Sequence, residues 1–335
     1  MNLLWKTEVG NQTSFERQFI DYLFDLNISD LEEINGLQRE NNQVVAVYSS
    51  NDRVLKESLF DYIRSHDNLY LVHLSNESLM HDGSYYKYSK GVLRSYFDPG
   101  VKFDNVFAIP LGYQTGFKRD AKLNLKSDAS NWIWVFVGQL KSDRLKMVNA
   151  LSNLQPNFLK PTSQFGGGGS GFSVNQMIDL YESTTFVPCP SGNINPDTFR
   201  VMESLECGCI PVVVKFYGID YFKYIYGDHP FIVGKNWNDA ALQIDELMSD
   251  SMKLNQKIRD VALWYESYKK YLRIDVCRIT SGASIDELES KQFKYQKSAK
   301  RSLYIRLIFW FHFRFVFLMR IIYSKMSRLI RLSGS

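Results

Sequence analysis

The chain has 335 residues, of which 45% are hydrophobic and 15% aromatic, so it can form one large domain or two medium ones. Its net charge is +4 at pH 7, but the segment after residue 290 contains 11 Lys and Arg and no acidic residue, which leaves −7 for residues 1–290. An acidic body argues against nucleic-acid binding, and the basic tail alone suits an anionic surface.

The cysteines and the N-terminal residues indicate the cellular compartment. None of the cysteines has metal-ligand spacing with a His, and we predict that all four are buried thiols: Cys189, Cys207, Cys209 and Cys277. The first residues lack the basic-then-apolar architecture of a secretory signal. We therefore expect the body of the protein to lie in the cytoplasm.

The first part of the chain alternates between strand and helix patterns, which is typical of a parallel sheet. Strands are predicted at 43–48, 69–74 and 105–109, with a short first strand at 2–5, and helices at 13–26 and 53–65. The Tyr-rich residues 84–97 are predicted to be a loop or a short helix. These elements form a first domain over residues 1–125, and the polar residues 118–131 connect it to the next.

The second part repeats the alternation and forms a second domain over residues 131–255. Strands are predicted at 132–137, 185–189 and 210–214, and helices at 143–154, 173–183, 196–208 and 237–248. For the helix at 196–208, Asn195 is the expected N-cap, Pro196 the first helical residue and Gly208 the stop. A long helix at 254–273 lies in a crossing segment, 256–290, and residues 291–335 form the tail.

The loop between the strand at 185–189 and the next helix is suited to an anionic ligand. Ser191, Gly192 and Asn193 are small and polar, and the helix that follows presents free N–H groups and the positive end of its dipole around Thr198. Arg200 and Glu203 share one face of that helix, where an Arg can hold phosphate and a carboxylate can accept from ribose. The alternative is an ordinary surface ion pair between these two side chains.

Another set of candidates follows the strand at 132–137. Gly138 stands at its carboxyl end, where open α/β sheets place ligands, and Lys141 and Arg144 come just after it. They are either phosphate ligands or solvated charges at the start of a helix.

These residues also carry a resemblance. The segment SGNINPDTFRVMESLECGCIPV, with HLSNE at 73–77, GVLRSYF at 91–97, IPLGY at 109–113 and FVG at 136–138, resembles exostosin-type glycosyltransferases, and most of all their ribitol xylosyltransferase branch. The resemblance implies the GT-B fold, in which two Rossmann-like domains face a cleft and the second binds the donor. It also implies that Arg200 and Glu203 contact the donor diphosphate and ribose, and it favours Arg144 as a further contact.

The resemblance further implies an inverting transfer of a sugar from a nucleotide-diphosphate donor to a hydroxyl of a glycan or lipid-linked acceptor in polysaccharide biosynthesis. We expect no metal or other cofactor, because a helix dipole and an Arg can stabilise the leaving diphosphate. The base should lie at a strand end of the first domain. Glu77 is the first choice, His81 and Asp82 follow, and Asp52 is weaker. Alternatives are a retaining or fucosyltransferase-like enzyme, and an inactive membrane-associated sugar-nucleotide or glycan-binding protein.

The tail suggests a helix at a membrane surface. No uncharged run within 303–332 reaches the ~18 residues needed to span a bilayer. At ~100° per residue, six basic side chains fall within an arc of about 140°, and apolar residues fill the rest. They are Arg306, Arg314, Arg320, Lys325, Arg328 and Arg331. We predict a peripheral helix at the cytoplasmic face of an anionic membrane; packing on the body, or dimerisation into a homo-oligomer, is the alternative.

Overall fold

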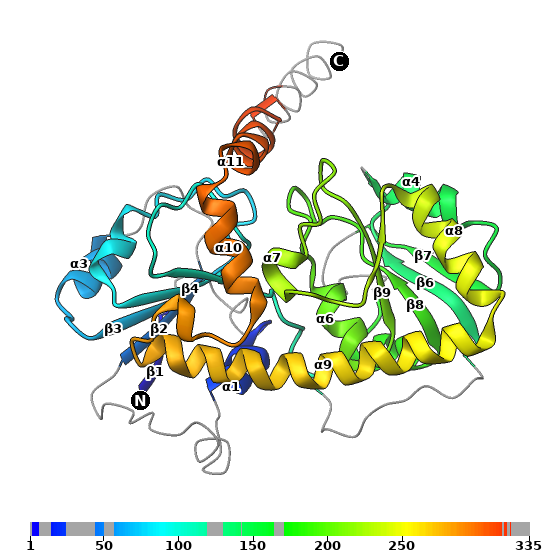
Figure 1. The fold of residues 1–335 in the computed structure, drawn as a ribbon, viewed down its shortest axis with the longest axis horizontal. Helices are drawn as coiled ribbons and strands as arrows, with labels where there is room; N and C mark the ends of the chain where they lie inside the picture. The colour runs from blue at the N-terminus through cyan, green and yellow to red at the C-terminus, as the bar shows by residue number, and fades with distance from the viewer. Residues whose placement is uncertain are drawn as a thin grey trace.

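The computed structural model describes residues 2–6, 15–24, 44–49, 57–118, 130–141, 143–163, 171–316, 318–319 and 322. Two parallel β-sheets with surrounding helices occupy these residues, one from each half of the chain (Figure 1). The predicted fold class, an α/β protein with two Rossmann-like domains, is confirmed. The weaker base candidate Asp52 lies outside the described residues.

The first sheet has the strand order β1-β2-β3-β4-β5, with every neighbouring pair parallel. Its strands are β1 (Asn2–Lys6), β2 (Val44–Ser49), β3 (Leu69–Leu74), β4 (Gly91–Ser95) and β5 (Val106–Ile109). The helices of this half are α1 (Arg17–Phe24), α3 (Glu57–Arg64) and the 3-10 helix η2 (Ser84–Tyr88). The loop or short helix predicted for 84–97 was therefore wrong in part: pairing with β3 and β5 makes a buried strand of GVLRS, although the segment contains a Gly and an Arg.

The second sheet has the order β10-β9-β8-β6-β7, again all parallel. Its strands are β6 (Trp132–Gly138), β7 (Asn157–Pro161), β8 (Thr184–Pro188), β9 (Ile210–Val214) and β10 (Ile232–Gly234). Its helices are α4 (Asp143–Leu151), α5 (Val174–Glu182), α6 (Phe199–Glu206), α7 (Lys223–Tyr226) and α8 (Trp237–Met248). The chain runs outward from β6 to β7 and then returns to the other side of β6, so the sheet has a topological switch point between β6 and β8.

The helix predicted from Pro196 begins three residues later. Thr198 is the N-cap and Phe199 the first residue of α6, whereas Asn195 uses its side-chain oxygen to accept from the N–H of Asp197, at 3.2 Å. Asp197 is 1% exposed and hydrogen-bonds to the N–H of Leu111 at 3.4 Å. This tertiary contact holds the segment before Phe199 out of the helix.

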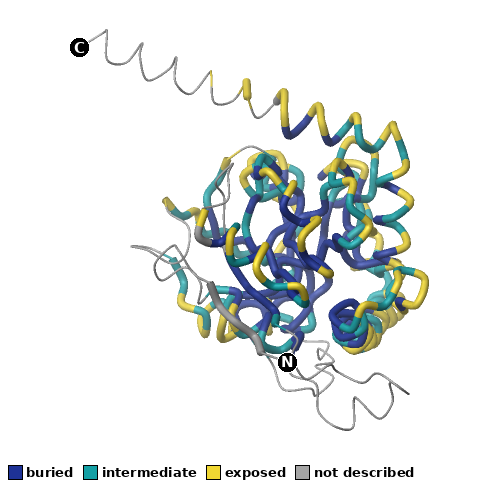
Figure 2. Tube along the Cα trace, turned by 90° about the vertical axis from the view of Figure 1, so that its left-hand side faces the viewer, coloured by how far each residue is buried: buried dark blue, intermediate teal, exposed yellow. Residues whose placement is uncertain are grey.

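A single long helix, α9 (Ser251–Thr280), joins the two halves. It runs beneath both domains in Figure 1 and contacts α1 and β4 of the first and α6, α8 and β9 of the second. Its 30 residues correspond to a length of roughly 45 Å. It includes the helix predicted at 254–273 and is longer at both ends. The apolar core continues from the first sheet into the second. Buried stretches of the chain, dark blue in Figure 2, form the centre of the molecule.

The tail does not form one helix. Ser302 separates α10 (Lys291–Arg301) from α11 (Leu303–Trp310), which continues as the π-helix η4 (Phe311–Val316); a short 3-10 helix, η3 (Ile285–Glu287), precedes them. Helix α10 packs on β5 and α7 and buries Phe293 and Gln296, so it belongs to the body. The predicted boundary at residue 291 differs from the structure for that reason. Arg320, Lys325, Arg328 and Arg331 lie outside the described residues.

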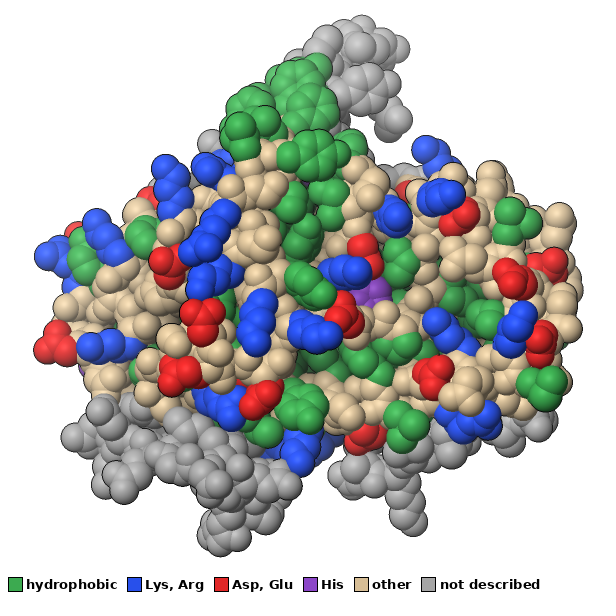
Figure 3. All heavy atoms as spheres, viewed as in Figure 1, with side chains coloured by type: hydrophobic (Ala, Val, Ile, Leu, Met, Phe, Trp, Pro, Cys, Tyr) green, Lys and Arg blue, Asp and Glu red, His purple; other side chains and the backbone are tan. Residues whose placement is uncertain are grey.

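Helix α11 leaves the body beside the boundary of the two domains, and large apolar side chains cover its outer surface (Figures 1 and 3). One face is packed: Phe309 and Phe313 are buried and contact Phe216 of the second domain. The other face is exposed, with Leu303 67% and Trp310 61% accessible. The π-helix changes the angle per residue, so the regular wheel used for the sequence prediction does not hold through 311–316.

Two of the other sequence predictions can be compared directly. The four cysteines are buried thiols, as predicted. Within the described residues, no helix is long and apolar enough to cross a bilayer.

Candidate donor-binding site

The candidate site lies at the switch point of the second sheet, at the carboxyl ends of β6 and β8. The β8–α6 loop, residues 189–198, leaves β8 there and leads to the N-terminus of α6. Ligands of doubly wound sheets bind at this place because the loops on the two sides of the switch point diverge and leave a crevice.

Arg200 lies across the end of β6. Its Nη2 donates to the carbonyl of Val137 at 2.9 Å, and its guanidinium carbon is 4.8 Å from the centre of the Phe136 ring. A Cβ at Gly138 would come within 2.6 Å of Nη2, so the glycine leaves the room in which the guanidinium lies. Two contacts therefore fix Arg200 at the strand end, and it does not extend into solvent as the alternative of a surface ion pair requires.

Arg144 and Lys141 add two more positive charges to the same place. Arg144 is 8% exposed and donates to the carbonyls of Gln139 at 3.2 Å and Ser191 at 3.1 Å. Burial, together with the nearby charge of Arg200, lowers the pKa of Arg144 to about 10. Lys141 donates to the side-chain oxygen of Asn193 at 2.5 Å, and burial and the charge of Arg144 lower its pKa.

Burial is the larger cause of both lowered pKa values, and a neighbouring positive charge is the second, Arg200 for Arg144 and Arg144 for Lys141. An anion bound beside these side chains would favour their charged forms and so offset both effects. The loop also leaves polar atoms unsatisfied: the buried Nε of Arg144 and Oγ1 of Thr198 have no hydrogen-bond partner among the described residues. Unpaired buried donors next to a positive site are suited to receive an anionic ligand.

The β8–α6 loop already holds an anion, the carboxylate of Glu77 from the first domain. Oε1 accepts from the backbone N–H groups of Asn193, of Ile194 at 2.8 Å and of Asn195 at 3.3 Å. Oε2 accepts from the side-chain amide of Asn193 at 3.0 Å. A Cβ at Gly192 would lie 2.5 Å from Oε1, so the lack of a side chain there permits the approach. Successive N–H groups that converge in this way form an anion-binding nest.

The segment that carries Glu77 has an unusual backbone. Ser75, Asn76 and Leu79 have positive φ angles of 69°, 62° and 54°, which residues other than glycine seldom adopt. Asn76 is 2% exposed, and its side-chain oxygen accepts from the N–H of His81 at 3.2 Å. Such conformations cost on the order of 1–3 kcal/mol each and persist where the surroundings enforce them, commonly at functional sites.

Two buried acids connect α6 to the first domain, and sequence reasoning missed one of them. Oε1 of Glu203 accepts from the N–H of Gln114 at 3.4 Å, and Asp197 accepts from the N–H of Leu111. Burial raises the pKa of both carboxyl groups to about 7. No motif distinguishes Asp197, because its partner is more than 80 residues away in the chain.

The two other base candidates lie elsewhere. His81 is 7% exposed and hydrogen-bonded through Nε2 to the hydroxyl of Tyr85 at 2.9 Å. Asp82 is exposed and accepts from the N–H of Ser84 at 2.9 Å and from its hydroxyl at 3.0 Å, as a turn cap does. Both line a cavity between the first domain and α11, and the β8–α6 loop is not part of its lining. The described part of the chain holds no group of three His, Cys, Asp or Glu that would suit a metal ion.

The structure thus brings together most of the predicted donor-site residues. Ser191, Gly192, Asn193 and Thr198 belong to the β8–α6 loop, and the residues beside them are Gly138, Lys141, Arg144, Arg200 and Glu77. Glu203 lies one turn further along α6 and faces Gln114.

No protein-family model matches the chain, and no curated protein matches it. Solved structures with a similar fold include an α1,3-fucosyltransferase, at 12% identity, covering 80% of this chain and 90% of that one with a TM-score of 0.43. Another is Anabaena HepE in complex with UDP and glucose, at 10% identity, 82% and 98% coverage and a TM-score of 0.48. A third is the DNA-modifying enzyme β-glucosyltransferase, at 12% identity, 84% and 99% coverage and a TM-score of 0.45.

Proposed function

We propose that the protein is a glycosyltransferase that moves a sugar from a nucleotide-diphosphate donor to a hydroxyl group of an acceptor. The observation that carries the proposal is the carboxylate of Glu77 in the nest of the β8–α6 loop, where backbone N–H groups of the loop donate to an anionic group. A donor diphosphate would take its place, with Arg200, Arg144 and Lys141 around it. The resemblance to exostosin-type enzymes supports the same reading.

The reaction follows from these positions. The acceptor oxygen attacks the anomeric carbon, the bond to the diphosphate oxygen breaks, and the diphosphate leaves with the electron pair. The N-terminus of α6 and the three cations stabilise the charge that develops on it. A single displacement of this kind inverts the anomeric centre.

The acceptor proton requires a base, and Glu77 is the nearest candidate. Its carboxylate reaches the β8–α6 loop from the first domain, so a diphosphate that displaced it from the nest would have it as a neighbour. Asp82 is hydrogen-bonded to Ser84 and His81 to Tyr85, which makes both less suited to act as the base.

We also propose that α11 and η4 rest on an anionic membrane surface. Leu303, Leu307 and Trp310 are more than half exposed in the described part of the chain, and such a row of exposed apolar side chains is typical of a surface that meets lipid. This would place the enzyme at the cytoplasmic face of a membrane. The acceptor would then be a glycan or glycolipid of a polysaccharide pathway.

The test is transfer by the purified protein from a panel of UDP- and GDP-sugars, with the anomeric configuration of the product determined by NMR. The proposal predicts release of nucleoside diphosphate with formation of an inverted glycoside. A retained configuration would favour a retaining enzyme, and binding of nucleotide sugars with neither transfer nor hydrolysis would favour an inactive binding protein.

A further inference from the structure

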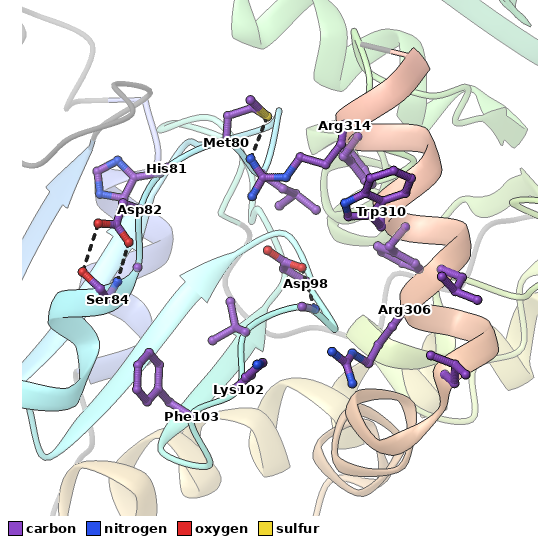
Figure 4. Close-up of a pocket in the computed structure, with 18 residues that line it drawn as sticks. Met80, His81, Asp82, Ser84, Asp98, Lys102, Phe103, Arg306, Trp310 and Arg314 are labelled. Carbon is purple, nitrogen blue, oxygen red and sulfur yellow. Dashed lines mark hydrogen bonds between the residues drawn. The ribbon is translucent and has the colours of Figure 1, made fainter. Parts of the chain in front are cut away.

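A cavity lies outside the donor site, between the first domain and α11. Its volume is about 670 Å³, within the range of small-molecule sites. The walls are the first-domain loops 79–84 and 98–103 on one side and α11 with the start of η4 on the other (Figure 4). Nothing in the donor chemistry above uses this space.

The cavity offers positive charge without a matching anion. Arg306 and Lys102 point into it, and neither forms an ion pair with a residue in the described ranges (Figure 4). Arg314 donates to the sulfur of Met80 at 3.2 Å, which is a weak acceptor that an oxyanion would readily replace.

The two carboxylates of the lining are already engaged. Asp98 accepts from the N–H of Gly100 at 2.8 Å and lies 3.8 Å from the guanidinium of Arg94. Asp82 caps the turn at Ser84. The cations of the lining therefore remain available for a ligand, and their charge favours an anionic one, with Arg suited to phosphate oxygens in particular.

The α11 wall also carries apolar side chains, and these continue outside the cavity. Leu303, Leu307 and Trp310 belong to the lining, and the same side chains are 67%, 54% and 61% exposed. A ligand seated among the cations can thus lay an apolar chain along these side chains of α11.

The cavity is also linked to the donor loop. His312, in η4, is hydrogen-bonded to the carbonyl of Ile194 at 3.0 Å, while Arg314 of the same turn reaches Met80. One turn of helix therefore touches both the β8–α6 loop and the rim of the cavity.

We infer that this cavity binds the acceptor, and that the acceptor is a lipid-linked phosphate or diphosphate. Arg306, Lys102 and Arg314 hold the phosphate, and the lipid chain follows Leu303, Leu307 and Trp310 toward the membrane. The sugar at the other end of the phosphate points to the β8–α6 loop. This inference rests on the proposed function and names the acceptor class of the same enzyme.

The test uses farnesyl diphosphate, a short and soluble isoprenoid diphosphate, with titration calorimetry on the full chain. Wild-type protein should bind it, and Lys102→Ala/Arg306→Ala should bind at least roughly tenfold more weakly, because two charge-assisted contacts are lost. Arg301→Ala is the matched control: this exposed Arg ends α10 outside the cavity lining and should leave the affinity unchanged. Failure of the wild type to bind, or equal affinity of the double variant, would overturn the inference.

Two further probes separate the sources of phosphate. Inorganic pyrophosphate should bind more weakly than farnesyl diphosphate by at least roughly tenfold, because it lacks the apolar chain. Dihexanoyl phosphatidylglycerol should also bind weakly, and an affinity equal to that of farnesyl diphosphate would assign the cavity to ordinary headgroups and overturn the inference. Binding of UDP and GDP to the wild type is measured in parallel. If neither nucleotide binds, the proposed donor site is refuted, whereas the lipid-phosphate site is still supported by its own titrations.

Discussion

Replacement of Glu77 by Ala should increase the affinity of the protein for nucleoside diphosphates. In the structure the carboxylate fills the nest that the donor diphosphate is proposed to use, so the nucleotide must displace it. A hydrogen bond to a charged group contributes about 1.5–3 kcal/mol net. Because Glu77 is partly exposed, we expect its displacement by the nucleotide to cost an amount near the lower end of that range. Removing that competitor should tighten binding roughly tenfold.

Titration calorimetry with UDP and with GDP, one pyrimidine and one purine nucleotide, measures this effect. Glu77→Gln should give a smaller gain, because its amide oxygen can still accept from the loop but without charge. Glu246→Ala, which removes an exposed acid of α8, serves as the control for net charge. Transfer by Glu77→Ala should fall even as binding tightens, if Glu77 is the base. An unchanged or weaker affinity for both nucleotides would refute the reasoning.

Three other outcomes follow from the structure. Because the folded-state pKa of Asp197 is raised from 3.8 to about 7, its stabilising contribution is present below about pH 4 and lost as pH rises through 7, on the order of 4 kcal/mol. Between pH 5.5 and pH 8.0, Asp197→Asn should therefore lose less free energy of unfolding than the wild type, as measured by urea unfolding. An equal loss in the two proteins would contradict the assignment. Gly112 has φ 84° and a Cβ there would overlap Phe19, so Gly112→Ala should destabilise the fold by about 2–3 kcal/mol, measured by the same unfolding; a loss below ~0.5 kcal/mol would show that Phe19 can move aside. Leu303→Ser/Trp310→Ser should weaken sedimentation with phosphatidylglycerol vesicles several-fold without lowering Tm, and retained sedimentation would argue against α11 as the membrane contact.

Most strands of the two sheets could be predicted from the sequence, but β4 and β7 could not. Uninterrupted apolar runs such as 69–74 and 132–137 predicted buried parallel strands, and the strand ends of a parallel sheet meet at one edge. Gly138 and Ser191 follow β6 and β8, which pair in the sheet, so the two candidate sets lie at the same edge.

Contacts between distant segments could not be predicted in the same way. The bond of Asp197 to Leu111 sets the start of α6, and the insertion of Glu77 into the loop of the other domain depends on how the domains pack. Pairing with two neighbours turned the Gly- and Arg-containing residues 91–95 into a strand. In the tail, periodicity identified an apolar face, but the turn at Ser302 and the π-helix at 311–316 determine which part of it packs on the body.

The central claim is that the β8–α6 loop and Arg200 bind the diphosphate of a nucleotide, and titration calorimetry of Arg200→Ala with UDP and GDP tests it most directly. Loss of a charge-assisted contact of about 2–3 kcal/mol should weaken binding by roughly 30- to 150-fold. Arg259→Ala, an exposed Arg of α9, should bind both nucleotides as the wild type does. Equal affinity of Arg200→Ala and wild-type protein would contradict the account.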